Sequence, residues 1–400
     1  MKILQINSVC SGSTGRIAAG VSSVLQEQGH ESLILYGRGG PANGVASERI
    51  ESKLDFYAHV AYARFSDRQG FASTLATRRM IRKIEAFSPD LIQMHNLHGY
   101  YLDQSVLLPF LADYGKPVVW TLHDCNAFTG HCAHFDAIGC MRWREQCHDC
   151  PLKSEYPKSI LLDQSARNYA EKKELTARLK QLTIVTPSRW LAKQVGQSFL
   201  GGRETITIHN GIDPNVFHPV KSDLRKQYGI EENQRLVLGV SNYWEPRKGL
   251  STFIDLAERL TENSVVVLVG LSHKQLQALP KNLIGIARTS SAAELAAWYS
   301  CADVFVNPTI EDTFPTTQIE ALACGTPVVC YDVGGCAESL DDSCGVAVPK
   351  GDFFALTDAV LGAKVFKREN CLRRAKMFYQ QDRYADYTAL YARLSGEGQV

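Results

Sequence analysis

Short apolar runs alternate with longer amphipathic stretches along almost the whole chain. The runs have the length of strands and contain few polar positions, which is the pattern of strands buried on both faces of a sheet. The predicted strands are residues 3–7, 32–36, 91–95, 118–122, 183–186, 205–209, 236–240, 265–269, 304–307, 328–331 and 345–348.

Helical periodicity fills most of the intervals between the apolar runs. The predicted helices include residues 16–28, 74–87, 165–180, 250–261, 292–301 and a last one at about 382–394. Ser291 and Glu294 have the spacing of a capping box at the start of one of them. Strands that alternate with helices predict an α/β fold with parallel, doubly wound sheets.

The length of 400 residues favours two domains. A stretch with several glycines and prolines, residues 201–219, interrupts the alternating pattern in mid-chain. We therefore expect one Rossmann-like domain over residues 1–200, with a cysteine-rich insert at 125–150, and a second over residues 201–379. The last helix, within about residues 380–400, has no strand after it and can pack on either domain.

The amino-acid composition excludes some classes of protein but does not indicate a particular function. The chain has 43 basic and 42 acidic residues, so its charge does not indicate a nucleic-acid partner. The first residues, MKILQINS, form too short an apolar run for a signal peptide, and no apolar run is long enough to span a membrane. Twelve cysteines in such a chain are expected to be mostly reduced, as in a cytoplasmic protein.

The segment at residues 307–329, NPTIEDTFPTTQIEALACGTPVV, combines a strand end, a helix start and an acidic residue. We expect the helix to open at residues 313–315, with Pro315 in its first turn and Gly325 just past its end. Unpaired N–H groups at a helix start form an anion site, and Glu320 can accept hydrogen bonds from two hydroxyls. A phosphate site beside an acceptor for a vicinal diol predicts a bound nucleotide.

Charged residues near this helix are further candidates. Arg247 and Lys248 follow the predicted strand 236–240, and ligands of doubly wound sheets bind at the carboxyl ends of strands. The two cations can therefore meet the same phosphates, or they form a solvated basic pair that opens a helix. Glu311 and Asp312 are candidates for acid and base chemistry, or for capping of the loop.

A glycine loop follows the first predicted strand and comprises Gly12, Ser13, Thr14, Gly15 and Arg16. Its glycines allow a ligand or another segment to approach the backbone closely. The loop is not G-x-G-x-x-G, and a Gly-Arg pair stands after the second strand where a dinucleotide-binding enzyme needs an acid. These two features argue against an NAD-dependent oxidoreductase.

Histidines follow two more predicted strands. His123 and Asp124 come after residues 118–122, and a neutral imidazole there can bind a sugar hydroxyl or serve a structural role. His95 and His98 raise the same question but are weaker candidates. Because the chain contains no Asp-x-Asp, the common metal–diphosphate motif is missing and the diphosphate charge must be balanced by cations and helix N–H groups.

The insert contains five cysteines within residues 125–150, with three histidines among them. Cys147 and Cys150 have the spacing of a zinc knuckle, and Cys132 and Cys140 would complete a structural site of four thiolates. The spacing is irregular, so free or redox-paired thiols are the alternative. We expect a zinc ion to stabilise an insert that has little core of its own.

The predicted helix at residues 74–87 separates an apolar stripe from four basic residues, Arg78, Arg79, Arg82 and Lys83. Such a helix can rest on an anionic bilayer. The alternative is an ordinary packed helix with a solvated basic face.

Motifs spread over nearly the whole chain resemble those of the retaining, GT-B-fold glycosyltransferases of family 4. They are GSTGR at residues 12–16, TLHD at 121–124, PSRW at 187–190, HNGIDPNVF at 209–217, EPRKG at 245–249, ADVFVNP at 302–308 and EALACGTPVV at 320–329. HNLHGYY at 95–101 and the cysteine-rich insert resemble the branch that builds colanic-acid-type bacterial exopolysaccharides. The resemblance implies two Rossmann-like domains that face each other across a cleft.

The resemblance also implies roles for particular residues. Lys248 would neutralise the diphosphate of a UDP- or GDP-sugar in the C-terminal domain, Glu320 would hold its ribose, and His123 would touch the transferred sugar. The acceptor would bind the N-terminal domain, the anomeric configuration would be retained, no active-site metal would be needed, and the C-terminal helix would cross back onto the N-terminal domain. Further donor contacts would come from Arg247, Asp312, Thr313, Phe314, Pro315, Thr316, Thr317, Asn242 and Arg288.

Two positions depart from the family pattern. Ser241 and Asn242 stand where the family usually has Gly-Arg, so one diphosphate contact is missing and Arg247 would replace it. The usual spacing of the two carboxylates selects Asp312 with Glu320 and places Glu311 one position too early.

The predicted function is a hexosyltransferase that extends an oligosaccharide linked to undecaprenyl diphosphate, in the biosynthesis of exopolysaccharide, capsule or lipopolysaccharide O-antigen. We expect a cytoplasmic protein with a peripheral contact to the inner membrane and no nucleic-acid partner. The alternatives are a nucleotide-sugar epimerase or hydrolase of the same fold and a non-catalytic nucleotide-sugar-binding subunit.

Overall fold

The computed structural model describes residues 1–260 and 263–396, and the chain divides into two compact units. Unit 1 comprises Met1–His209 together with the C-terminal segment from Arg383, and unit 2 comprises Asn210–Asp382. The first unit extends past residue 200, where the sequence predicted the boundary, because strand β7 (Glu204–Thr207) pairs with strand β6 (Leu182–Thr186).

Unit 1 is built on a parallel sheet of seven strands in the order β3-β2-β1-β4-β5-β6-β7. Its other strands are β1 (Lys2–Val9), β2 (Glu31–Arg38), β3 (Ser47–Arg49), β4 (Leu91–Met94) and β5 (Val118–Thr121). Strand β3 has the sequence SER, and without an apolar side chain it could not be predicted. Its helices are α1 (Gly12–Glu27), α2 (Lys53–Ser66), α3 (Thr74–Phe87), α4 (Gln104–Tyr114), α5 (Ser165–Ala177), α6 (Arg189–Gly196) and α14 (Gln380–Ser395).

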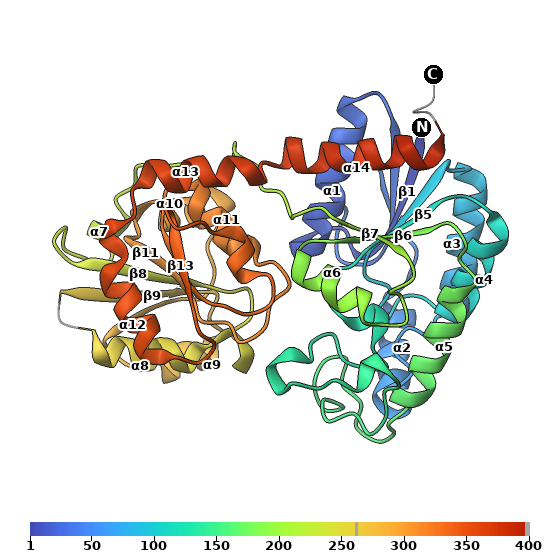
Figure 1. Cartoon of the computed structure of the whole chain (residues 1–400), viewed down its shortest axis with the longest axis horizontal. Helices are drawn as coiled ribbons and strands as arrows, with labels where there is room; N and C mark the ends of the chain where they lie inside the picture. The colour runs from blue at the N-terminus through green and yellow to red at the C-terminus, as the bar shows by residue number, and fades with distance from the viewer. Residues whose placement is uncertain (261–262, 397–400) are drawn as a thin grey trace. The chain divides into compact units, whose positions relative to one another are not determined.

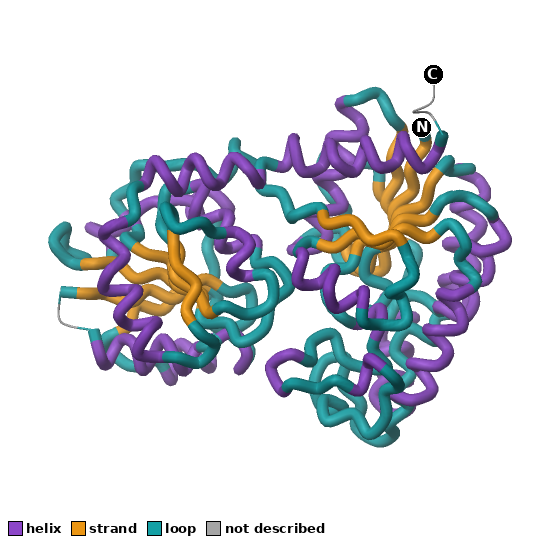
Figure 2. The backbone as a smooth tube through the Cα atoms, viewed as in Figure 1, coloured by secondary structure: helices purple, strands orange, loops and turns teal. Residues whose placement is uncertain are grey.

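Helices lie on both faces of this sheet (Figures 1 and 2). Alternate strand residues pack into separate cores on the two faces, because successive side chains point to opposite sides. Ile3, with other residues of the central strands, packs with α1 and α14 on one face. Its neighbour Leu4 lies in the core that contains Met80 of α3 and Leu107 of α4 on the other face.

Helix α14, near the C-terminus of the chain, packs on unit 1. Tyr384 lies against Gly20 of α1, where a Cβ atom would come within 2.3 Å of the tyrosine ring. The hydroxyl of the buried Tyr391 donates to Oε1 of Gln93 on β4 at 2.5 Å. The last helix therefore belongs to unit 1 through both apolar packing and a buried hydrogen bond.

Helix α3 has the predicted bounds, and most of its apolar stripe is buried or partly buried, whereas Leu75 in its first turn is 65% exposed. Met80 and Ile84 are fully buried in the core of unit 1, whereas Arg78 and Arg82 are exposed. The helix is thus an ordinary packed element with a basic outer face. None of the helices in the described part of the chain is long and apolar enough to cross a membrane.

Unit 2 has a parallel sheet of six strands in the order β10-β9-β8-β11-β12-β13. The strands are β8 (Arg235–Val240), β9 (Ser264–Val269), β10 (Leu283–Ile286), β11 (Val304–Asn307), β12 (Val328–Tyr331) and β13 (Gly345–Val348). The helices are α7 (Leu224–Gln227), α8 (Leu250–Arg259), α9 (His273–Ala278), α10 (Ala292–Cys301), α11 (Thr316–Ala323), α12 (Phe353–Gly362) and α13 (Arg368–Ala375). The predicted class of two doubly wound α/β units is confirmed.

Two helix ends differ from the predictions. The predicted end of α8 at residue 261 lies outside the described residues. At the start of α10, Ser291 accepts a hydrogen bond from the N–H of Glu294, but the Glu294 carboxylate accepts from Ser290 instead. Only half of the predicted capping box therefore forms.

Each sheet reverses its direction of winding at one pair of neighbouring strands. The pairs are β1 and β4 in unit 1 and β8 and β11 in unit 2. Ligands of open α/β sheets bind outside the carboxyl ends of the strands at such points. The loops after these four strands are therefore where functional residues are expected.

Candidate functional site

In unit 2, the loops after β8 and β11 meet through a lysine and a carboxylate. Lys248 ends a short 3-10 turn (Pro246–Lys248), and its Nζ donates to Oδ2 of Asp312 at 2.5 Å. The exposed fractions of the two side chains are 22% and 16%, so the pair is half-buried but open to a ligand. An ammonium group in such a setting is poised to bind an additional anion.

Arg247 ties the same two loops together. Its Nη1 donates to the carbonyl of Glu311 at 3.1 Å, and its Nε pairs with Glu245 at 3.1 Å. Its own carbonyl accepts from the N–H of Ile310 at 2.9 Å and from the hydroxyl of Thr309 at 3.1 Å. Much of the donor capacity of Arg247 is therefore used to hold the loop after β11 in position beside Lys248.

The helix after this loop begins one residue beyond the predicted range of 313–315, so the predicted start is wrong. Helix α11 begins at Thr316, and Pro315 has an extended backbone at the N-cap. The residue before a proline is disfavoured from helical geometry, so Phe314 cannot be helical. Phe314 and Thr313 are buried instead, and the Phe314 carbonyl accepts from Nδ2 of Asn210 at 3.2 Å. The backbone N–H groups of Thr316 and Thr317 open the helix.

Glu320 lies in the second turn of α11 and is 3% exposed. The hydroxyl of the fully buried Tyr299, on α10, donates to its Oε2 at 3.0 Å. Hydrogen bonds to a carboxylate in such a water-poor setting are strong, because the local dielectric constant is low. The sequence did not point to Tyr299, since an apolar helix with one tyrosine is ordinary core.

Two glycines after β12 pack against the backbone carbonyl of Asp312. Gly334 has φ +55°, and a Cβ atom there would lie 1.8 Å from the Asp312 carbonyl oxygen. The N–H of Gly335 donates to the same oxygen at 3.1 Å. The adjacent glycines Gly334 and Gly335 were a sequence signal for this close approach that the sequence analysis did not use.

The remaining predicted residues of unit 2 take different positions. Asn242 and Arg288 are exposed on the loops after β8 and β10. Glu311 is 2% exposed, in contrast to the half-buried Asp312. Asp312 rather than Glu311 therefore presents its carboxylate beside Lys248.

In unit 1, the loops after β4 and β5 form a chain of buried hydrogen bonds. Nε2 of His123 lies 2.9 Å from Nδ1 of His95, and the two rings are stacked. Nε2 of His95 lies 2.9 Å from Oε1 of Gln5 on β1. Nε2 of Gln5 donates to the carbonyl of Ala18 at 3.0 Å and to Ser22 at 2.8 Å.

This chain determines the tautomer of each imidazole. A backbone carbonyl can only accept, so Ala18 fixes the orientation of the Gln5 amide and makes its Oε1 the acceptor for His95. His95 then carries its proton on Nε2, and its Nδ1 accepts from Nε2–H of His123. Burial, together with His123, holds the pKa of His95 well below its usual range, and burial lowers the pKa of His123 to about 4.

We expect His123 to remain a neutral imidazole with its proton on Nε2 between about pH 5.5 and pH 8, because its pKa lies below that window. Two-bond ¹H–¹⁵N correlation spectra of histidine-labelled protein report this tautomer directly. In the Gln5→Leu variant, His95 loses its acceptor and the His123 signal should show a mixture of tautomers. A His123 ring that titrates with an ordinary midpoint would contradict this chain of hydrogen bonds.

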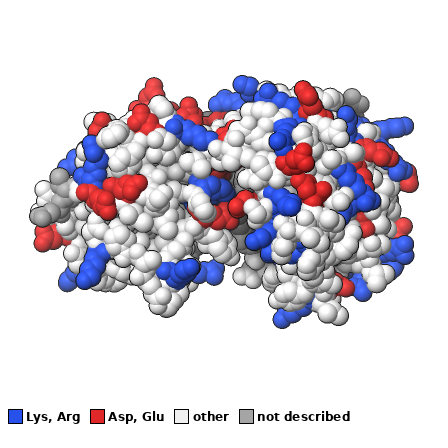
Figure 3. Space-filling view, turned by 90° about the horizontal axis from the view of Figure 1, so that it is seen from below, with Lys and Arg blue, Asp and Glu red and all other residues white. Residues whose placement is uncertain are grey.

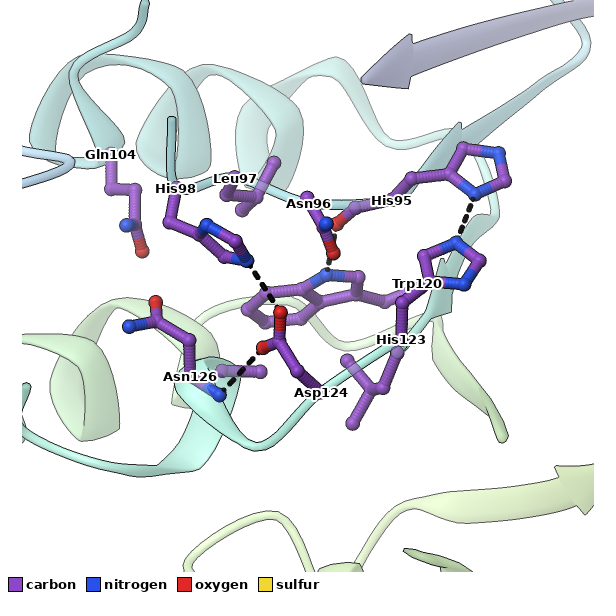
Figure 4. Close-up of a pocket in the computed structure, with 11 residues that line it drawn as sticks. His95, Asn96, Leu97, His98, Gln104, Trp120, His123, Asp124 and Asn126 are labelled. Atoms are coloured by element: carbon purple, nitrogen blue, oxygen red, sulfur yellow. Dashed lines mark hydrogen bonds and ion pairs between the residues drawn. The ribbon is translucent and has the colours of Figure 1, made fainter. Parts of the chain in front are cut away.

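His95 and His123 line a small pocket, and a second pair, His98 and Asp124, lines it as well (Figure 4). Nε2 of His98 and Oδ2 of Asp124 point toward each other at 2.7 Å, and Nδ1 of His98 lies 3.1 Å from the Tyr156 hydroxyl. Burial alone would raise the pKa of Asp124, but His98 and the N–H of Asn126 lower it well below its usual range. The pocket therefore offers a neutral imidazole at one end and an ionised carboxylate at the other.

The glycine loop of unit 1 opens α1 at the carboxyl end of β1. Gly15 has no room for a side chain, because a Cβ atom would lie 2.5 Å from the carbonyl carbon of Cys10. Thr14 accepts a long hydrogen bond of 3.4 Å from Nδ2 of Asn7, and Gly12 and Arg16 are exposed. The side chain of Ser13 lies outside the described residues.

Glu51, which no sequence motif indicated, is buried in unit 1 and takes part in a polar cluster. Its Oε1 accepts from Ser73 at 3.2 Å, and Ser73 lies 2.8 Å from Nδ1 of the buried His59. Burial raises the pKa of Glu51 from 4.5 to about 8. At neutral pH this carboxyl group is therefore mostly protonated.

The raised pKa of Glu51 predicts a loss of stability as the pH rises. Between about pH 5 and pH 8 the unfolded chain ionises at this residue while the folded chain stays protonated, so unfolding releases a proton and becomes easier. Relative to the Glu51→Gln variant, the free energy of unfolding should fall by at most about 1.4 kcal/mol per pH unit. Denaturant titrations at several pH values measure it. In the control variant Glu27→Gln, which changes an exposed side chain, the free energy of unfolding should depend on pH as it does in the wild type. The assignment would be contradicted if the Glu51→Gln variant also showed the pH dependence of the wild type.

The cysteine-rich insert has an aromatic core, whereas we predicted that it has little core of its own. The ring of Trp143 lies 4.8 Å from that of Phe135 and 5.2 Å from that of Phe128. These three rings are fully buried, and the buried Lys172 of α5 donates to the carbonyl of Asn126 at 2.7 Å. The insert is therefore held by packing whether or not it binds a metal.

The four cysteines proposed as zinc ligands are free thiols. Within residues 1–260 and 263–396, no group of three or more His, Cys, Asp or Glu side chains is arranged to hold a metal ion. A hydrogen bond from Cys132 lowers the pKa of Cys150 to about 7, and Sγ of Cys147 accepts from the N–H of Gly130 at 3.2 Å. Cys140 is partly exposed, and the structural zinc stays a prediction.

Two family profiles match the chain. The profile described as Glycosyltransferase Family 4 matches residues 14–216, which is about half of the chain. The profile described as Glycosyl transferases group 1 matches residues 234–363 and contains the loops of Lys248 and Asp312. The two matches thus fall on unit 1 and unit 2 almost separately.

Similar proteins and structures agree with these matches. WcaC from Escherichia coli (strain K12), whose name describes a colanic acid biosynthesis glycosyl transferase, is 24% identical over 89% of both chains. The alpha-galactosylglucosyldiacylglycerol synthase of Streptococcus pneumoniae is 32% identical over 33% of this chain and 39% of its own.

Among solved structures, Anabaena HepE in complex with UDP has a TM-score of 0.69 at 17% identity, over 98% of this chain and 100% of HepE. Sucrose-phosphate synthase from Thermosynechococcus elongatus has a TM-score of 0.71 at 16% identity, over 99% and 100%. At these identities the structural likeness shows the GT-B fold.

Proposed function

Because the chain belongs to glycosyltransferase family 4, we propose that it transfers a sugar from a nucleotide-sugar to a hydroxyl group of a growing, lipid-linked oligosaccharide. The anomeric configuration is retained, and the product belongs to a bacterial exopolysaccharide or a related surface polysaccharide. The relation to WcaC favours this biological setting.

The observation that carries the proposal is the Lys248–Asp312 pair at the carboxyl ends of β8 and β11. A diphosphate bound there would meet the Lys248 ammonium group and the N–H groups that open α11. Its nucleoside would extend toward Glu320, whose carboxylate suits the two ribose hydroxyls. HepE, which has the same fold, was solved with UDP and with UDP-glucose, and this supports a UDP-sugar as the donor.

In the proposed reaction, the bond between the anomeric carbon and the β-phosphate oxygen breaks while the acceptor oxygen attacks from the same face of the sugar. Negative charge grows on the departing diphosphate, and Lys248 with the α11 N–H groups stabilises it. The acceptor hydroxyl gives its proton to the departing phosphate oxygen. Asp312, held by Lys248, Gly334 and Gly335, is positioned to bind a hydroxyl of the transferred sugar.

His123 has a narrower role under this proposal. Its Nε2 proton is committed to His95, so the ring can accept a hydrogen bond from a sugar hydroxyl but does not provide a proton. Arg247 acts mainly by fixing the loop after β11, since it already binds Glu245 and the carbonyl of Glu311.

A product assay tests the proposed function. The protein is incubated with UDP-glucose, UDP-galactose, or GDP-mannose, with and without membrane extracts that contain lipid-linked oligosaccharides, and the products are identified by mass spectrometry and NMR. The proposal predicts extension of the lipid-linked oligosaccharide with an anomeric configuration equal to that of the donor. Release of free sugar or an epimerised nucleotide-sugar without acceptor would favour a hydrolase or an epimerase, and binding without turnover a non-catalytic subunit.

A further inference from the structure

Exposed apolar side chains of unit 1 gather in one place. In its described residues, every exposed large hydrophobic side chain lies within residues 54–75 or 138–162. On α2, Leu54, Tyr57 and Phe65 are 79%, 67% and 58% exposed. Tyr62 and two exposed alanines, Ala58 and Ala61, continue the same side of the helix at spacings of three and four residues. The outward side of α2 is therefore apolar along its whole length.

A loop from the end of the cysteine-rich region extends this apolar side. The N–H of Ile160 donates to the carbonyl of Arg64 at 2.7 Å, and the N–H of Leu162 donates to that of Phe65 at 3.3 Å. These bonds place the loop beside the C-terminal end of α2. Ile160, Leu161 and Leu162 are 59%, 65% and 46% exposed. We define the α2 surface as the outward side chains of α2 (Leu54, Tyr57, Ala58, Ala61, Tyr62 and Phe65) together with Ile160, Leu161 and Leu162.

The opposite side of α2 accounts for its attachment to unit 1. His59 and Ala63 are buried, and His59 is bonded to Ser73 at the start of α3. Asp55 caps the helix through Ser52 and pairs with Arg79 of α3 at 3.3 Å. These contacts hold the inner side of the helix on unit 1, whereas the large outward side chains are mostly exposed and Tyr57 contacts only the edge of the Phe56 ring among the aromatic contacts of the described residues.

Basic side chains outnumber acidic ones along α2, α3 and the loop between them, and of these Arg68 and Lys83 pair with Glu171 and Glu48. Residues 53–85 contain seven basic side chains and three acidic ones, a net charge of +4, whereas the whole chain has +1. Arg78 and Arg82 are exposed on α3, the helix that is joined to α2 by the Arg79–Asp55 pair. Figure 3 looks onto the lower end of unit 1 as drawn in Figure 1, and on this face Lys and Arg side chains lie next to uncharged surface, with Asp and Glu side chains among them.

We propose that the α2 surface docks unit 1 on an anionic phospholipid bilayer, with α2 parallel to the membrane plane. Leucine, isoleucine, tyrosine and phenylalanine side chains would enter the interface between headgroups and acyl chains, and the arginines would contact lipid phosphates. A second copy of the chain is a poorer occupant, because two surfaces with the same positive charge repel each other. The proposal goes beyond the proposed function, since it concerns where the protein binds and not what it transfers.

Vesicle co-sedimentation tests the proposal. The wild type should bind vesicles of phosphatidylglycerol and phosphatidylcholine and bind phosphatidylcholine alone much more weakly. The Leu54→Glu/Phe65→Glu variant should lose at least about tenfold in partitioning, because it places two charges in the apolar interface. The Arg78→Glu/Arg82→Glu variant should lose the preference for phosphatidylglycerol. As a matched control, Phe354→Glu/Val365→Glu changes two side chains of unit 2 that are 63% and 75% exposed, and it should bind like the wild type.

Thermal unfolding and UDP affinity serve as controls for folding and for the donor site. Both should be unchanged in the Leu54→Glu/Phe65→Glu variant, so a failure of the membrane proposal is distinguishable from a failure of the proposed function. The proposal is overturned if the wild type ignores anionic vesicles or if the unit 2 control loses binding equally. A wild type that forms dimers without vesicles, and a variant that is monomeric, would assign the surface to a second copy instead.

Discussion

Replacing Lys248 by alanine should lower turnover by about 10²–10³, the usual effect of removing one group that stabilises charge in a transition state. The structure indicates that no neighbouring cation within the described residues should compensate for the loss of Lys248. Lys248 is the cation that meets Asp312 at the point where unit 2 reverses its winding, and Arg247 beside it is engaged by Glu245 and the carbonyl of Glu311. A neighbouring arginine so engaged should not replace the missing ammonium group. Steady-state kinetics with a saturating donor measure the effect.

Two further variants separate catalysis from simple charge balance. Lys274→Ala removes an exposed lysine of α9 in the same unit and should leave turnover unchanged. Lys248→Ala/Asp312→Asn removes both members of the pair. If Lys248 served only to neutralise Asp312, the double variant would regain activity. We expect it to be at least as impaired as Lys248→Ala, and recovery to near wild-type turnover would remove the lysine from the mechanism.

The second large effect is expected at Glu320. Its replacement by alanine should weaken nucleotide binding by about 1.5–3 kcal/mol, the range for hydrogen bonds to a charged group, which corresponds to roughly 10- to 150-fold in Kd. The carboxylate is already buried and held by Tyr299, so the ribose hydroxyls would meet an acceptor that needs little reorganisation. Isothermal titration with UDP measures the change.

Tyr299→Phe is the matched control for Glu320→Ala. Both variants lose the same buried hydrogen bond, but the phenylalanine variant keeps the carboxylate. Both should therefore lose stability, by about 1–3 kcal/mol for a buried group left without its partner. Only Glu320→Ala should also lose most of its nucleotide affinity. Equal nucleotide affinity in the two variants would limit Glu320 to a structural role.

Much of the fold was predictable because its strands are buried on both faces and stand out as apolar runs. Three of the elements that were not predicted have identifiable causes. Strand β3 contains no apolar side chain, and β10 is a short run, LIGI, interrupted by Gly285. Helix α2 escaped prediction because its outward side is as apolar as its buried side, which removes the periodicity that marks an amphipathic helix. The same apolar outward side chains form most of the α2 surface.

The candidate donor site was predictable in part. The position of Lys248 and Asp312 after strands of one parallel sheet suggested that they lie together, and the structure brings them into contact. The partner of Glu320 and the hydrogen-bond chain behind His123 were not predictable. Gln5 and His95 are separated by 90 positions, and nothing in the sequence indicates which way an amide or an imidazole points. Side-chain orientation depends on the packed core, whereas loop position follows from topology.

The central claim is that unit 2 holds a nucleoside diphosphate through Lys248 and the start of α11 without a divalent ion. Hydrogen exchange of protein treated with EDTA, measured with and without UDP or GDP, tests it most directly. We expect one of these nucleotides to slow exchange in residues 241–249 and 309–320. Protection confined to unit 1, or protection that appears only after manganese is added, would contradict it.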